Sequence, residues 1–261
     1  MFDAIALFLL GGIAGHVLNT VLFRVILSLK EDEIAQACGS DRSIRSKAGD
    51  TVGMGYFQPL FASCSAIREY RDWFRGDKPF RVQAIHFITA VATWLVIMRF
   101  GLSPKGLAGL FCLYCLILLA FTDKETGYLP DCLTYAFLLS GLLANIGYWH
   151  VPPTDSVLGA FSGYGTLWML NTVYRKCTGE DGMGHGDFKM IAGLGAWFGW
   201  LALPFIIMAA SLMAILTECF KMAGKGRRMK NRFPFGPYLA IAALPVLLYG
   251  EWLTLALNDF S

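Results

Sequence analysis

Two acidic clusters stand at the edges of long apolar runs, and their aspartates are the residues best placed to do chemistry. Asp123 directly follows the uncharged stretch 106–122, and Asp187 comes just before the stretch 190–217. Carboxylates brought close together cannot both ionise cheaply, so they share one proton. One carboxylate can then activate a water molecule while the other acts as an acid. This is the chemistry of aspartic proteolysis.

Glycines precede Asp187, since Gly182, Gly184 and Gly186 occupy alternate positions before it. They permit backbone conformations that are closed to other residues and let a peptide approach without meeting a Cβ. Helix capping is the competing interpretation, because Asp is a favoured N-cap residue. For Asp187, helix capping stays an open alternative to catalysis. For Asp131, which is followed by an apolar helix, capping is the preferred interpretation.

The composition indicates a membrane protein. Of the 261 residues, 56% are apolar and only 16% are charged, and the mean hydropathy is +0.51. Soluble domains carry about 25% charge, which argues against a water-soluble globule. The apolar content excludes a disordered chain, and seven Cys are too few for a disulfide scaffold. The net charge of +3 is too small to indicate binding of nucleic acid.

Seven uncharged stretches have the composition of membrane helices, at residues 4–23, 82–98, 106–122, 132–154, 156–174, 190–217 and 233–250. Stretch 190–217 is long and contains Gly199 and Pro204, so it is either one tilted helix or two short ones. If it is split, twenty of the 22 Lys and Arg fall on one side of the membrane. Because basic residues mark cytoplasmic loops, we expect about eight transmembrane helices with both termini outside.

Several blocks of the sequence resemble the type IV prepilin peptidases, which are membrane aspartic proteases of the GxGD type. The two signature blocks lie at residues 123–131, which end in Leu129-Pro130-Asp131, and at residues 184–189, which read GHGDFK. Residues 15–24, 193–200 and 234–237 resemble further blocks in the family's order, although His16 stands where the family usually has Ser.

The resemblance implies an all-α polytopic membrane protein whose catalytic aspartates, at the cytoplasmic face, correspond to Asp123 and Asp187. The supporting residues that it indicates are Gly184, Gly186, Lys189, Pro130 and Asp131. Two interpretations of Lys189 stay open, because it could orient a carboxylate or anchor its helix at the interface.

The implied substrates are prepilin or pseudopilin precursors, which carry a short basic leader before an apolar helix and are cut after a Gly. The implied location is the bacterial inner membrane, so the lipid bilayer is a partner and nucleic acid is not. Proteolysis by two aspartates needs no cofactor. Many members of the family also methylate the new N-terminal amine with S-adenosylmethionine. No oligomeric state is predicted.

We expect three parts of the chain: a first transmembrane helix at 1–27, a small cytoplasmic loop domain at 28–81 and a membrane peptidase domain at 82–261. Many family members carry two C-x-x-C pairs in the first cytoplasmic loop, an arrangement suited to zinc. Here that loop holds only Cys38 and Cys64, so we predict no structural zinc. Cys112 and Cys115 form a C-x-x-C inside an apolar stretch, where packing is the preferred interpretation.

Two other functions compete with proteolysis. A proton-coupled small transporter would need acidic residues near the bilayer midplane, whereas the centres of the expected helices carry no Asp or Glu. A catalytically silent pilus assembly platform is disfavoured because both aspartates and the glycine block are intact, and an activity assay distinguishes it.

Overall fold

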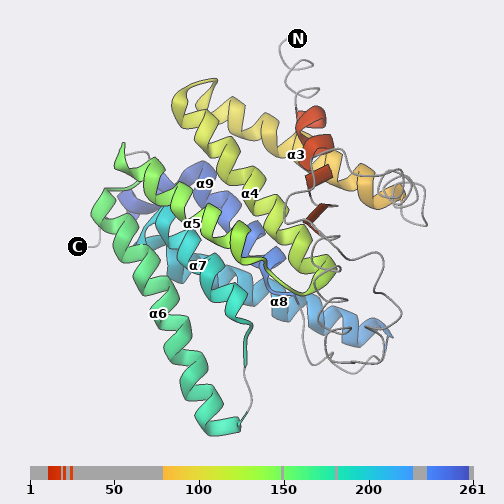
Figure 1. Ribbon diagram of the computed structural model, residues 1–261, viewed down its shortest axis with the longest axis vertical. Helices are drawn as coiled ribbons and strands as arrows, with labels where there is room; N and C mark the ends of the chain where they lie inside the picture. The colour runs from red at the N-terminus through yellow and green to blue at the C-terminus, as the bar shows by residue number, and fades with distance from the viewer. Residues whose placement is uncertain are drawn as a thin grey trace, which may run out of the picture. The chain divides into compact units, whose positions relative to one another are not determined.

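The computed structural model describes residues 11–18, 20–21, 24–25, 79–147, 150–179, 182–225 and 234–258. Within these ranges all regular structure is helical, as the sequence predicts (Figure 1). The elements are α3 (Pro79–Phe100), α4 (Pro104–Thr126), α5 (Asp131–Ile146), α6 (Pro153–Thr178), α7 (His185–Phe198), the 3-10 helix η1 (Trp200–Ala202), α8 (Leu203–Lys225) and α9 (Gly236–Asn258). The expected loop domain at 28–81 lies largely outside the described residues and stays a prediction.

The chain divides into two compact units, residues 1–91 and residues 92–261. In the first unit, residues 11–18 form a helix that packs against the first part of α3. Gly15 is buried at this contact, and a Cβ added to it would lie 3.0 Å from the Cα of His86. A small residue therefore permits the close approach of the two helices.

In the second unit, capping residues define both ends of α4. Ser103 is the N-cap, and its hydroxyl accepts a hydrogen bond from the N–H of Gly106 at 3.2 Å. At the other end Gly127 has a φ of 66°, and its N–H donates to the carbonyl of Asp123 at 2.7 Å. Because this left-handed conformation favours glycine, α4 ends within one turn of Asp123.

Helix α7 is buried along most of its length, and all residues from 190 to 198 are buried. It packs against α5, α6 and α9, and Figure 1 shows it beside α5 and α6. Gly195 of α7 and Gly159 of α6 lie so close that a Cβ on either would overlap the backbone of the other. Two glycines therefore allow α6 and α7 to pack backbone against backbone.

The apolar stretch 190–217 is interrupted at Gly199. Helix α7 ends at Phe198, Gly199 has a φ of 77°, and α8 begins at Leu203 after η1. Pro204 lies in the first turn of α8, where its missing N–H has no intrahelical partner to lose. The predicted division of this stretch into two helices is confirmed, whereas the number of membrane crossings stays a prediction.

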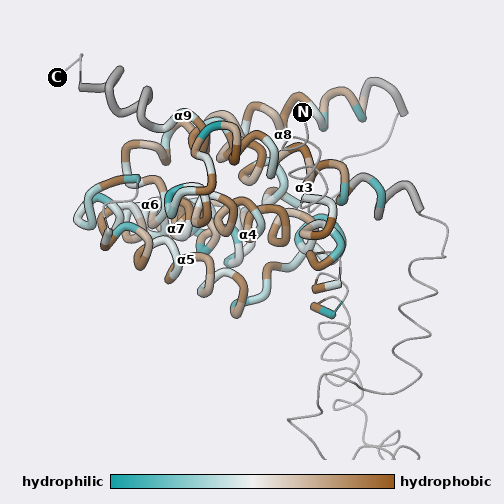
Figure 2. Tube along the Cα trace, turned by 90° about the horizontal axis from the view of Figure 1, so that it is seen from above, coloured by the Kyte–Doolittle hydropathy of each residue, from teal (hydrophilic) through white to brown (hydrophobic). Residues whose placement is uncertain are grey.

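Apolar side chains cover much of the exterior. Among the described residues, two helical segments, Pro104–Thr126 and Trp200–Met222, are long and apolar enough to cross a membrane, and three shorter apolar helices are Ile85–Phe100, Asp131–Ile146 and Gly236–Gly250. Phe161 on α6 is 75% exposed and Phe220 on α8 is 76% exposed. Figure 2 shows hydrophobic residues along the length of the helices. Large apolar side chains exposed in such number are typical of contact with lipid or another apolar partner.

Replacing Gly159 with Ala should destabilise the protein, because the added Cβ would overlap the backbone of Gly195. We expect the free energy of unfolding to fall by about 1–3 kcal/mol, the usual cost of overpacking, measured by denaturation of the purified protein in detergent. The matched control is Gly165→Ala on the same helix, where an added Cβ meets nothing within 4 Å. Equal stabilities of the two variants would contradict the close packing of α6 on α7.

Candidate active site

Asp123 lies in the last turn of α4 and is buried, with only 5% of its surface exposed. Its Oδ2 accepts a hydrogen bond of 2.8 Å from the backbone N–H of Gly236, the first residue of α9. The N-terminal end of a helix carries free N–H groups and a partial positive charge. The start of α9 therefore stabilises a negative charge on Asp123 although this side chain is withdrawn from water.

Gly236 is a site residue that the sequence did not identify. A Cβ at this position would lie 2.8 Å from Oδ2 of Asp123 and 3.1 Å from its Cβ, so a larger residue would push the two apart. The block 234–237 stood out in the sequence through a resemblance alone, with no role attached. A glycine between two prolines before an apolar run indicates the start of a helix, but it does not reveal which side chain that start will meet.

Asp187 is the third residue of α7. The N-cap of this helix is Gly184, whose carbonyl accepts a hydrogen bond from the N–H of Asp187 at 3.1 Å. The alternative that Asp187 itself is the N-cap is therefore wrong. Its side chain is partly exposed and precedes the buried run 190–198, so it lies at the accessible end of an otherwise enclosed helix.

The carboxyls of Asp123 and Asp187 are electrostatically coupled. Burial raises the pKa of Asp187 to about 7, and the negative charge of Asp123 contributes to the increase. The two acids, from α4 and α7, therefore lie close enough for the charge of one to affect the protonation of the other; that they form one catalytic site stays a prediction. A carboxyl that titrates near neutral pH close to a second carboxyl has the properties of a general acid or base.

The backbone around the acids is shaped by small residues and a proline. A Cβ added to Gly186 would lie 2.8 Å from the Cβ of Leu129, which is buried in the turn between α4 and α5. At Gly184 an added Cβ would lie 3.7 Å from Oδ2 of Asp187. Pro130 follows Leu129 and is the N-cap of α5. The start of α7 can therefore lie directly against the residues that connect α4 to α5.

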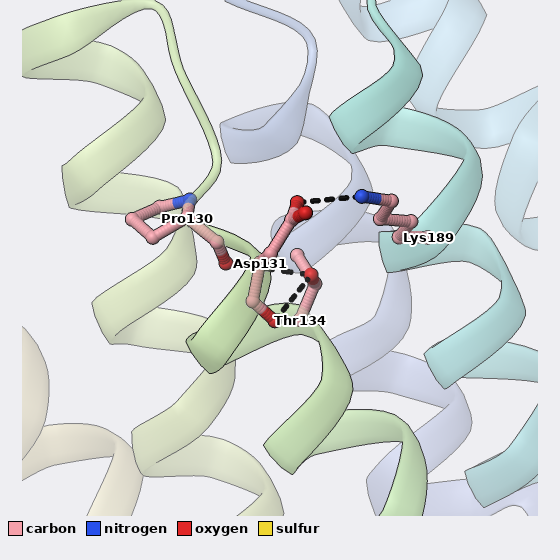
Figure 3. Close-up of polar contacts among 4 residues, drawn as sticks. All are labelled: Pro130, Asp131, Thr134 and Lys189. Atoms are coloured by element: carbon pink, nitrogen blue, oxygen red, sulfur yellow. Dashed lines mark hydrogen bonds and ion pairs between the residues drawn. The ribbon is translucent and has the colours of Figure 1, made fainter.

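Asp131 and Lys189 form an ion pair that joins α5 to α7 (Figure 3). The ammonium of Lys189 donates to Oδ1 of Asp131 at 2.6 Å and lies 5.0 Å from the centre of the Tyr135 ring. The hydrogen bond to Asp131 raises the pKa of Lys189, which therefore stays charged. Of the two interpretations of Lys189, orientation of a carboxylate agrees with this contact.

The N-terminus of α5 differs from the expectation that Asp131 caps it. Pro130 is the N-cap, and Asp131 is the first residue inside the helix, so the expected cap is wrong. The hydroxyl of Thr134 donates to the carbonyls of Pro130 and Asp131 at 3.3 and 3.1 Å (Figure 3). The carboxylate of Asp131 is consequently available to Lys189.

No metal centre is evident in the part of the chain that the structure describes, where no three His, Cys, Asp or Glu side chains are grouped. Cys112 is buried and Cys115 is partly buried, both as free thiols, which agrees with the packing interpretation. Cys38 and Cys64 lie outside the described residues. The absence of zinc from the first loop therefore stays a prediction.

Fold and site together define a helical membrane protein with two coupled aspartates at the ends of packed helices. Residues 110–218, which contain both aspartates, match the type IV leader peptidase family. A protein of Dickeya chrysanthemi named prepilin leader peptidase/N-methyltransferase is 31% identical over 277 residues, covering 95% of this chain and 94% of that protein. The chain belongs to the type IV leader peptidase family.

Other relatives named prepilin leader peptidase/N-methyltransferase match a shorter part of this chain. The protein of Aeromonas salmonicida (strain A449) is 38% identical over 174 residues, and that of Neisseria gonorrhoeae is 40% identical over 179 residues. These matches cover 67% and 69% of the chain but 60% and 58% of the relatives, so the chain spans about three fifths of their length. No solved structure matches the chain significantly.

Gly236→Ala should lower the free energy of unfolding by about 1–3 kcal/mol, because the new Cβ would overlap Oδ2 of Asp123. In a protein that already carries Asp123→Ala, the same change should cost less, because the 2.8 Å contact with Oδ2 is gone and only the 3.1 Å contact with the Cβ of residue 123 remains. The double-mutant cycle should therefore give a coupling of at least about 1 kcal/mol, measured by denaturation in detergent.

The matched control for this cycle is Gly250→Ala on the same helix, where the nearest atom to an added Cβ is 3.7 Å away, an ordinary contact. Its effect should be the same with and without Asp123→Ala. Additive effects of Gly236→Ala and Asp123→Ala would contradict the contact between α9 and Asp123.

Proposed function

We propose that this chain is a membrane aspartic endopeptidase that removes the basic leader peptide from type IV prepilins or pseudopilins. The observation that carries the proposal is the coupling between Asp123 and Asp187, which raises the pKa of Asp187 to about 7 together with burial, the larger cause. An aspartic peptidase needs one proton shared by two carboxyls. The names of its relatives support leader cleavage as the reaction that this pair performs.

Each acid has a distinct part in the proposed reaction. Asp123, as a carboxylate, takes a proton from a water molecule, whose oxygen adds to the carbonyl carbon of the scissile peptide. Asp187 gives its proton to the carbonyl oxygen. When the tetrahedral gem-diol collapses, the C–N bond breaks, the leaving amine takes the proton that Asp123 received from water, and a hydroxyl of the gem-diol returns a proton to Asp187 as the carboxyl product forms. The N–H of Gly236 favours the charged form of Asp123, and burial favours the protonated form of Asp187.

The placement of the two acids fits a substrate that is itself held in the membrane. Asp123 lies near the end of the apolar segment Pro104–Thr126, and Asp187 precedes the buried run of α7. A prepilin holds its apolar helix in the bilayer and its basic leader in water, so its scissile bond lies where the apolar segment ends. The exposed glycine at position 184 leaves backbone accessible beside Asp187, which suits an approaching peptide.

The distribution of the basic residues supports a cytoplasmic position of the site. The loops that border Asp123 and Asp187 fall on the side that holds twenty of the 22 Lys and Arg when the chain crosses about eight times. Because such loops are cytoplasmic, we place the site on the cytoplasmic face of the bacterial inner membrane. The cut is proposed to follow a Gly of the precursor.

Methylation of the new N-terminus is proposed as a second activity. It is supported by the relatives, which are named N-methyltransferases as well as peptidases. S-adenosylmethionine would supply the methyl group. We assign none of the described residues to this cofactor and derive no step through it.

Asp123→Asn and Asp187→Asn should each reduce leader cleavage by at least about 100-fold, the usual contribution of a general acid or base. An amide can neither accept the proton of water nor share one with its partner. Cleavage of a prepilin by purified protein in detergent, followed by mass spectrometry of the new N-terminus, measures the loss and locates the cut. With S-adenosylmethionine added, the same spectrum reports methylation.

Asp155→Asn, in the first turn of α6, makes the same chemical change without touching the pair. This variant should cleave at the wild-type rate, and all three variants should accumulate in the membrane. Leader cleavage at the wild-type rate by Asp123→Asn or Asp187→Asn would contradict the proposed function.

Cleavage should fall as the pH rises through about 7, because the pKa of Asp187 is raised to about 7 and its proton is lost above that value. An ordinary Asp would have lost this proton near pH 4. A profile of kcat/KM between about pH 5 and pH 9 should decline about tenfold per unit on its alkaline side. A profile that stays flat up to pH 9, with the protein still folded, would contradict the assignment of Asp187 as the acid.

A further inference from the structure

The segment before α7 is held by one side chain of α6. Oδ1 of Asn171 accepts hydrogen bonds from the backbone N–H of Gly182, at 2.9 Å, and of Met183, at 3.2 Å. A carbonyl oxygen has two lone pairs and can accept both donors at once. A single amide side chain thus binds two successive peptide groups shortly before Asp187.

The same face of α6 also makes an apolar contact with this segment. A Cβ added to Gly182 would lie 2.8 Å from Cδ1 of Tyr174 and 3.1 Å from its Cε1, so the backbone of Gly182 lies against the Tyr174 ring. Tyr174 follows Asn171 by three positions on α6, which places the two side chains as neighbours on one face of the helix. We call Asn171 and Tyr174 the α6 clasp.

The chain around Asp187 is held at two points, one on each side of this residue. On its N-terminal side the α6 clasp holds Gly182 and Met183, and on its C-terminal side Lys189 is paired with Asp131 of α5. Figure 1 shows α7 beside both of these helices. Without the clasp, two backbone N–H groups would lose their acceptor and the start of α7 would be held from the α5 side alone.

We propose that Asn171 is a positioning residue for leader cleavage: by accepting the N–H groups of Gly182 and Met183, it fixes the segment that carries Asp187 relative to Asp123. This role rests on the proposed function. Asn171 acts through the backbone and not on the reacting atoms. Displacement of a catalytic group by about 1 Å can cost about 100-fold in rate, so loosening this segment should lower kcat rather than weaken binding of the precursor.

The test compares Asn171→Leu, which keeps the size of the side chain and removes the acceptor, with Asn171→Asp, which keeps the acceptor. Full-length protein in detergent is assayed with a prepilin, and kcat and KM are separated. Asn171→Leu should lower kcat by at least about tenfold with KM within about twofold of wild type, whereas Asn171→Asp should restore most of kcat. Thr172→Val, the adjacent control whose hydroxyl donates within α6 to Trp168, should leave kcat unchanged.

Hydrogen exchange gives a readout that does not depend on turnover. The amides of Gly182 and Met183 should exchange at least about tenfold faster in Asn171→Leu than in wild type or Asn171→Asp, while the amides of α7 from residue 190 onward stay protected. A general loss of protection, with wild-type kcat per folded molecule, would show that Asn171 only stabilises the fold and would overturn the proposal.

Two further results would also overturn it: wild-type kcat in Asn171→Leu, or equal losses of kcat in the Leu and Asp variants. Either result, with a wild-type protein that cuts prepilin, would refute the role of Asn171 and leave the proposed function intact. A wild-type protein that cuts no prepilin would instead refute the proposed function, and the positioning role with it.

Discussion

Two carboxyl groups placed near each other, one buried and the other only partly exposed to water, cannot both carry a negative charge at low cost. This constraint governs the site, because it keeps a proton on Asp187 up to a pH at which an exposed Asp would be fully ionised. Burial of Asp187 is the larger cause of the raised pKa, and the charge of Asp123 adds to it. Asp187 therefore keeps its proton part of the time near neutral pH, and the proposed hydrolysis requires one protonated carboxyl of this kind.

The fold satisfies this constraint by placing each of the two acids at the end of a helix. Gly127 ends α4 within a turn of Asp123, so this acid lies at the margin of an apolar helix and not in its middle. The first N–H of α9 then compensates the charge of Asp123. Asp187 lies in the first turn of α7, and the glycine contact between Gly159 and Gly195 lets α7 pack tightly on α6. Short-range packing thereby holds two residues that lie far apart in the chain.

The features that could be predicted from the sequence are those encoded locally. The interruption of the stretch 190–217 is visible as Gly199, whose positive φ ends α7. Asp123 and Asp187 stand out because each is a charge at the edge of an apolar run. Their catalytic role stays a prediction that rests on the resemblance and on this placement.

The contacts that could not be predicted join segments far apart in the chain. Gly236 and Asp123 are 113 positions apart, and the residues around either one do not indicate that the other is its partner. The choice of Asp131 as a helix cap failed because Pro130 takes the N-cap position and Lys189, from another helix, takes the carboxylate. Asn171 gives no local signal either, since an Asn in an apolar helix indicates a polar contact without identifying it.

The most direct measurement of the coupling is an infrared titration of the Asp187 carboxyl, recognised as the C=O band that disappears in Asp187→Asn. The account predicts a midpoint at about pH 7 in the wild-type protein. It predicts a lower midpoint in Asp123→Asn, because the charge that helps to retain the proton has been removed. A wild-type midpoint near pH 4, the ordinary value for Asp, or a midpoint that does not move in Asp123→Asn, would contradict it.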